Sequence, residues 1–218
     1  MSKKIAVVLS GCGNKDGSEI TEAVSLIISL SELGAELQFF APNKEFAPKN
    51  FLTNEPLPQK RNIMLESARI TRSKITPLEK LNADQFDGLA IPGGYGAAMH
   101  LCTWAIEGAK CSVDSHLEQS ILKFHSQSKP IAAICIAPVI LAKVLGTKKV
   151  TITLGESEEA IKEVEKTGAQ HENCPPTDYI TDRENKVISS PAYMFDEAKP
   201  HEVFKGSAGL SKELMEIA

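Results

Sequence analysis

The chain has 218 residues, of which 42% are hydrophobic, and its formal net charge is −4 at pH 7. This length and composition suit one α/β domain spanning residues 1–218. The acidic balance and the absence of a Lys/Arg run leave no phosphate-binding face, so nucleic acid is not an expected partner.

The apolar pattern and the cysteines exclude two further classes of protein. The longest apolar runs are too short to span a membrane, and the opening MSKKIAVVLS leads into a strand pattern without a cleavable apolar segment. We therefore expect no membrane partner and a cytoplasmic location. The five cysteines form no CxxC or CxxH pair, which favours reduced thiols and argues against a metal site.

The N-terminal segment predicts a βαβ unit. Lys4 to Ser10 reads as a buried strand, Ser18 as the N-cap of a helix that Gly34 ends, and Glu36 to Phe40 as a second strand. Glu19 then lies in the first turn of the helix, at the carboxyl edge of the sheet. Acidic residues are common there because they complement the helix dipole, so a structural role for Glu19 stays open.

The middle of the chain contains a glycine loop. The proline-rich stretch from 42 to 58 predicts a long irregular connection or two short hairpin strands, and 61–69 and 78–85 predict short helices. The strand Asp87 to Ile91 runs directly into Pro92-Gly93-Gly94-Tyr95-Gly96. Glycines at this place allow either a tight structural turn or a loop that directs N–H groups at an oxyanion.

The segment Ile131 to Leu141, which reads IAAICIAPVIL, places a cysteine where a strand becomes a helix. A thiol on such a turn occupies the position of a nucleophile elbow, and the field at a helix start favours thiolate over thiol. Cys135 is therefore predicted to have a lowered pKa. The alternative is an inert core cysteine, because free Cys is among the most buried residue types.

Alternating strands and helices predict a doubly wound, mostly parallel sheet with helices on both faces, and ligands bind such sheets at the carboxyl ends of the strands. Glu19, the glycine loop and Cys135 all meet that edge. A carboxyl group beside a thiol can hold or move a proton during addition to a carbonyl. The N–H groups of Gly93, Gly94 and Ile136 are the expected oxyanion or substrate-binding groups.

Four segments together carry a resemblance that covers nearly the whole chain: SGCGNKDGSEITEAV, PGGYGAAMHL, CIAP and SPAYM. They resemble the PfpI-like (class I glutamine amidotransferase-like) superfamily, and within it the ElbB family of isoprenoid biosynthesis glyoxalases. The resemblance implies a flavodoxin-like fold, a homodimer, and a lyase that converts glyoxal, a small 2-oxoaldehyde, to glycolate without glutathione, metal or cofactor. It also implies Cys135 as nucleophile and Glu19 as its acidic partner.

Ile136 departs from the wider superfamily, where many members have a His after the nucleophile. A Cys-His-acid triad cannot form there, so protease activity is not expected and turnover should be low; His100 and His171 are the remaining candidate histidines. A GxCxG elbow, usual in glutamine amidotransferases, is absent because Ala133 and Ala137 flank the cysteine. The alternatives are a binding or redox-responsive protein with a reactive Cys, and an amidase or protein deglycase of the same superfamily.

Overall fold

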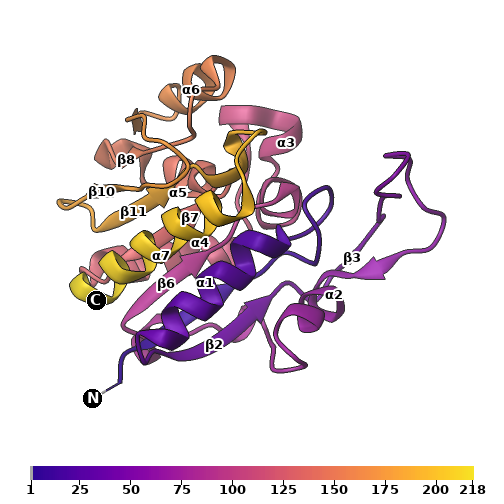
Figure 1. The fold of residues 1–218 in the computed structure, drawn as a ribbon, viewed down its shortest axis with the longest axis horizontal. Coiled ribbons are helices and arrows are strands. Elements are labelled where there is room, and N and C mark those ends of the chain that lie inside the picture. Colours follow the sequence, from indigo (N-terminus) through magenta and orange to yellow (C-terminus); the bar gives the residue numbers. More distant parts are fainter. Residues whose placement is uncertain (1) are drawn as a thin grey trace.

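The computed structural model describes residues 2–218 and contains a central seven-stranded sheet in the order β10-β11-β7-β6-β1-β2-β5 (Figure 1). All neighbouring strands are parallel except β10 and β11. The strands are β1 (Lys4–Val8), β2 (Glu36–Ala41), β5 (Thr76–Pro77), β6 (Gly88–Ile91), β7 (Ile131–Ile134), β10 (Ile180–Asp182) and β11 (Val187–Ser190).

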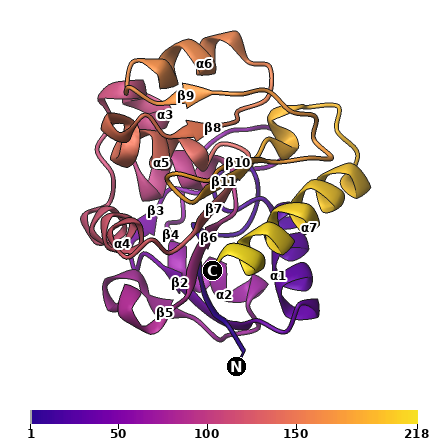
Figure 2. The ribbon, with the colours of Figure 1, turned by 90° about the vertical axis from the view of Figure 1, so that its left-hand side faces the viewer.

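Helices cover both faces of this sheet, as the sequence predicts for a flavodoxin-like α/β fold. On one face, α1 (Ile20–Glu32) and α7 (Pro200–Ile217) lie side by side, and Leu26 and Leu210 are among the side chains that they bury (Figure 2). On the other face, α4 (Ser115–Ser126) and α5 (Pro138–Leu145) bury residues that include Phe124 and Leu141. Two apolar cores therefore hold the sheet rigidly between helices.

Shorter elements surround the sheet. They are α2 (Ile63–Ile70), α3 (Trp104–Glu107), α6 (Glu158–Glu165), the antiparallel pair β3 (Glu45–Phe46) and β4 (Arg61–Asn62), and the parallel pair β8 (Thr151–Ile152) and β9 (Gln170–His171). The segment between β3 and β4 projects from the molecule in Figure 1. The helix predicted over 78–85 is wrong, because two separate 3₁₀ turns, 78–80 and 83–85, replace it.

The start of α1 differs by one residue from the sequence prediction, and this difference bears on the site. Glu19, not Ser18, is the N-cap: its side-chain oxygen accepts a hydrogen bond from the Glu22 N–H at 2.7 Å. The Ser18 hydroxyl instead accepts from the Ser10 N–H at 2.9 Å and fastens the loop to the end of β1. None of the helices within residues 2–218 is long and apolar enough to cross a bilayer.

Candidate active site

Cys135 sits on a strained turn between β7 and α5. Its φ of 61° lies in the left-handed region, which costs a residue with a side chain on the order of 1–2 kcal/mol. Its N–H donates to the Ser190 carbonyl oxygen at 2.8 Å, so the neighbouring strand β11 holds the turn in place. The side chain is 7% exposed. Backbone strain maintained by the surrounding sheet is typical of a functional position.

The carboxyl group that contacts the Cys135 thiol belongs to Glu22, and not to Glu19 as the sequence suggested. Glu22 lies in the first turn of α1, is fully buried and hydrogen-bonds to the Cys135 side chain. Its two oxygens also accept from the N–H groups of Gly93, at 3.0 Å, and Tyr193, at 3.4 Å. Glu19 is drawn away by its capping bond, because that bond turns its carboxylate toward the Glu22 N–H.

The glycine loop supplies backbone N–H groups to this pair. Those of Gly94 and Ile136 bond to the Cys135 sulfur, whereas that of Gly93 is engaged by Glu22. The Gly93 N–H is therefore committed to Glu22 in this structure, and oxyanion or substrate binding stays a prediction for the N–H groups of Gly94 and Ile136. Gly93 has a steric role: a Cβ there would lie 2.5 Å from the Cys135 Cβ and 2.7 Å from the Ile134 carbonyl oxygen, closer than real contacts allow.

The two acids of this pair hold their protons more tightly than free side chains do. Burial, and next the charge of Glu19, raises the pKa of the Glu22 carboxyl to about 8. Burial, followed by the charge of Glu22 when ionised, also raises the pKa of the Cys135 thiol, while the Gly94 and Ile136 N–H groups lower it. The lowered thiol pKa predicted from the sequence is wrong in direction, because burial outweighs the N–H groups.

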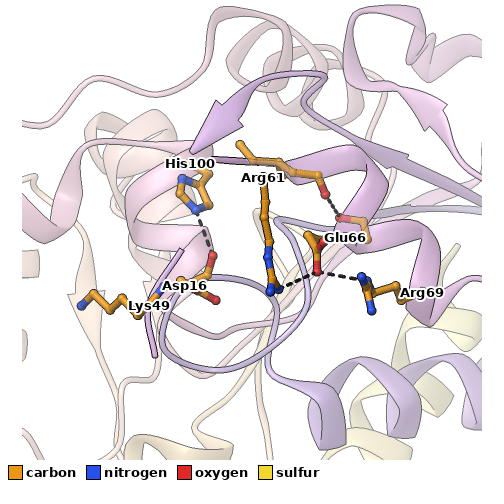
Figure 3. A network of polar contacts seen from close by, with 8 residues as sticks. Asp16, Lys49, Arg61, Glu66, Arg69 and His100 are labelled. Carbon is orange, nitrogen blue, oxygen red and sulfur yellow. Dashed lines mark hydrogen bonds and ion pairs between the residues drawn. The ribbon is translucent and has the colours of Figure 1, made fainter. Parts of the chain in front are cut away.

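The loop between β1 and α1 is fixed by polar contacts with segments distant in sequence (Figure 3). His100 donates from Nε2 to the Asp16 carbonyl oxygen at 3.0 Å, and the Asp16 carboxylate accepts from the Lys49 N–H at 2.6 Å. Nearby, Glu66 pairs with Arg61 and Arg69. His100 thus fastens the loop that leads to Glu19, and its pKa is lowered by burial.

The thiol opens into a cavity of about 570 Å³. Glu19, Gly94 and Ile136 line it together with Cys135, so four of the five predicted site residues meet here. The lining also includes residues that the sequence did not assign to the site: Ser157, Tyr193, Met194 and Asp196. Neither His100 nor His171 lines this cavity. Over residues 2–218, no group of three or more His, Cys, Asp or Glu side chains is placed to hold a metal ion.

Glu22 is the candidate site residue that the sequence interpretation missed, although a signal for it existed. Along α1, Glu22 shares a buried face with Leu26 and Ser29. A carboxyl group on the apolar face of a helix must find partners inside the protein, which marks it for a special role. The resulting site has a thiol, a buried carboxyl group in contact with it, and backbone N–H donors beside both, which is the arrangement that a cysteine nucleophile with an acid-base partner requires.

Comparison with curated proteins finds relatives over almost the entire chain. The rat protein described as ES1 protein homolog, mitochondrial, is 38% identical over 98% of this chain and 84% of its own length. The human glutamine amidotransferase-like class 1 domain-containing protein 3, mitochondrial, is 37% identical over 98% of this chain and 83% of its own. The cytoplasmic location expected from the sequence gains no support from these two mitochondrial proteins.

Among solved structures, an isoprenoid biosynthesis protein with an amidotransferase-like domain from Ehrlichia chaffeensis superposes with a TM-score of 0.90. It is 31% identical, and the match covers 99% of this chain and 100% of that protein. Drosophila melanogaster DJ-1beta, at 19% identity and a TM-score of 0.58, shares the fold. The DJ-1/PfpI family model matches residues 3–193, from β1 through the cavity residue Tyr193. The chain belongs to the DJ-1/PfpI family.

Proposed function

We propose that this protein is a glutathione-independent glyoxalase of low turnover, of the ElbB type, which converts glyoxal to glycolate. The observation that carries the proposal is the contact of the Cys135 thiol with the Glu22 carboxyl and with two backbone N–H groups, at the floor of an accessible cavity. A protein thiol so placed supplies the nucleophile for which other glyoxalases would require glutathione. The likeness to a protein described as acting in isoprenoid biosynthesis supports the same assignment.

The first step is addition of the thiol to one aldehyde carbon of glyoxal. The pair first loses one of its two protons, and the proton that remains is shared between Glu22 and sulfur. As the S–C bond forms, the carbonyl π electrons move to oxygen, and that oxygen takes the shared proton from Glu22. The N–H groups of Gly94 and Ile136, which point at sulfur in the free protein, are close enough to stabilise the transient oxyanion. The product is a hemithioacetal.

The second step converts this hemithioacetal into a thioester. Glu22, now a carboxylate, removes the proton from the carbon bonded to sulfur, which gives an enediolate. The hydroxyl proton on that carbon moves to the neighbouring oxygen, and Glu22 returns its proton to the neighbouring carbon. This internal oxidation and reduction leaves a glycolyl thioester on Cys135. Water hydrolyses the thioester to glycolate and regenerates the thiol, so atoms and electrons balance without an external oxidant or reductant. Glu19, at the cavity wall, remains a candidate second acid-base group for the water.

The other functions predicted from the sequence are less well supported. No histidine lines the cavity in the part of the chain that the structure describes, so the Cys-His pair that activates the nucleophile in many cysteine amidases and proteases is missing here. A redox-responsive cysteine must be a thiolate, whereas the raised pKa of Cys135 keeps it protonated at neutral pH. A protonated Cys135 thiol can still add to an aldehyde, because the thiol proton can move to Glu22 as the S–C bond forms.

The direct test is production of glycolate from glyoxal by the purified protein, without glutathione and after removal of metal ions by a chelator. We expect slow but catalytic turnover, with many glycolate molecules formed per protein. Intact-protein mass spectrometry during turnover should detect a glyoxal-derived adduct on the peptide that contains Cys135. Failure of the wild-type protein to produce glycolate would rule out this proposal.

We also propose that the protein is a homodimer, because α1 carries an unpartnered apolar stripe. Ile20, Val24 and Ile28 recur every fourth residue and are 49%, 38% and 51% exposed. A second copy of the chain packed on this stripe would remove its apolar side chains from water. Light scattering should give a dimer for the wild type and a monomer for Ile28→Glu, whereas Leu52→Glu, at another exposed apolar residue, should stay dimeric. A wild-type monomer at every concentration would contradict the proposal.

A further inference from the structure

The cavity above Cys135 has an uneven distribution of charge. Two carboxylate residues, Glu19 and Asp196, line it, and no Lys, Arg or His does so among the described residues. Ser157, which also lines the cavity, caps α6, and Glu159 in the first turn of that helix offsets its positive end. The substrate therefore meets negative charge as it approaches the thiol.

Lysines near this cavity are engaged elsewhere. Lys15, next to the lining residue Asn14, donates from Nζ to the Phe51 carbonyl oxygen at 2.9 Å. In α6, Lys162 pairs with Glu158 at 3.0 Å. Within residues 2–218, neither Glu19 nor Asp196 forms an ion pair with a Lys, Arg or His side chain. A negative charge brought into a partly closed space with them is repelled more strongly than in open water.

The remaining wall is apolar and larger than glyoxal requires. Tyr95, Ile136, Tyr193 and Met194 contribute carbon surface to a space of about 570 Å³, which is in the range of pockets that bind whole metabolites. A carbonyl compound with a hydrocarbon or aromatic substituent would fill this space. Binding of that substituent would hold the aldehyde carbon close to the thiol.

We propose that Glu19 and Asp196 are specificity-determining residues, which select uncharged or cationic 2-oxoaldehydes with an apolar substituent and exclude compounds that carry a carboxylate or phosphate. This inference rests on the proposed function for the identity of the reaction. The charge selection itself concerns which compounds reach the Cys135 thiol, whether or not the protein converts them. Glu19 should contribute more than Asp196, because Glu19 is half-buried and Asp196 is exposed and better screened by solvent.

The first experiment measures access to the thiol without turnover. Alkylation of Cys135 by neutral iodoacetamide and by anionic iodoacetate is followed at pH 8.5 by mass spectrometry of the Cys135 peptide, with the small neutral thiol 2-mercaptoethanol as reference. The ratio of the two rates should exceed that of the reference thiol about tenfold or more. Glu19→Gln, which keeps an oxygen for the helix cap, should lower the ratio about fivefold, and Asp196→Asn about twofold.

The matched control is Glu79→Gln, which changes the net charge equally at an exposed position outside the cavity and should leave the ratio unchanged. A second experiment compares turnover of phenylglyoxal and 4-carboxyphenylglyoxal, which differ by one remote carboxylate. We expect kcat/KM to favour the neutral compound at least about tenfold, and Glu19→Gln to reduce that preference. Alkylation ratios equal to the reference thiol in all proteins would overturn the inference. Charge-selective alkylation without any turnover would uphold the inference and overturn only the proposed glyoxalase activity.

Discussion

Replacing Cys135 with alanine is expected to lower kcat/KM for glyoxal by about a thousandfold or more, because no other thiol reaches the cavity in the described chain. The variant removes the atom that forms the covalent intermediate, so the remaining groups can only polarise hydrated glyoxal. The substitution should leave the fold intact, since alanine is smaller and can adopt the φ of 61° at a cost similar to that of cysteine.

Cys12→Ala provides the matched control. Cys12 is a partly exposed thiol in the loop before α1 and does not line the cavity, so its loss should change turnover less than about twofold. Turnover of the wild type and of Cys12→Ala should also increase as the pH is raised toward 8, because one proton of the Cys135–Glu22 pair must leave before attack and the Glu22 pKa is about 8. Equal glycolate production by wild type and Cys135→Ala would rule out the covalent route.

The position of Cys135 at a strand-to-helix turn could be predicted because it depends on local sequence. The apolar strand 131–134 followed within a few residues by a helical pattern locates the carboxyl edge of the sheet, and Cys135 is the residue at that junction. The same argument places Gly94 beside it, since β6 and β7 are parallel neighbours and end at the same edge. Local patterns of this kind specify which edge a residue occupies.

The partner of the nucleophile could not be identified in this way, because it depends on where α1 begins. Ser18 and Glu19 are both competent N-caps, and helix boundaries are uncertain by a residue or two. Once Glu19 is the cap, its carboxylate is committed to the Glu22 N–H and the next acid along the helix faces the sulfur. Choosing between the two acids required the contacts that Glu22 makes with Cys135 and with the Gly93 N–H, which join segments far apart in the chain.

Two further features depend on contacts between segments far apart in the chain. The pKa of Cys135 is set mainly by burial, and the depth of a side chain below the surface is not encoded in the strand-to-helix pattern. The cavity lining also includes Ser157 and residues of the 193–196 segment, which lack a periodic pattern that would have assigned them to the site. Aperiodic segments acquire their role only when the sheet brings them to its edge.

The wild-type protein is expected to lose folding stability between about pH 5 and pH 8, and Glu22→Gln should lack this loss. The pKa of Glu22 is about 8 in the folded protein, against 4.5 for the free side chain. Between these values the folded state binds more protons than the unfolded state, so the free energy of unfolding falls as pH rises. The full pKa difference corresponds to a decrease of at most about 5 kcal/mol in the free energy of unfolding. This is an upper value because the buried carboxylate can relax toward solvent.

Urea unfolding at several pH values from 5 to 8.5 isolates the contribution of Glu22 to the pH dependence of folding stability. The proteins compared are wild type, Glu22→Gln and the exposed control Glu79→Gln. His100 and His171, whose pKa values are lowered by burial, act in the opposite direction below about pH 6.5 and equally in all three proteins. The Cys135 thiol begins to contribute only near and above pH 8.5, where the unfolded chain ionises it. Parallel stability curves for wild type and Glu22→Gln would mean that Glu22 is already ionised in the folded protein at neutral pH. In that case the carboxyl group could not deliver a proton to the developing oxyanion, and the addition step would have to draw that proton from water or from Glu19.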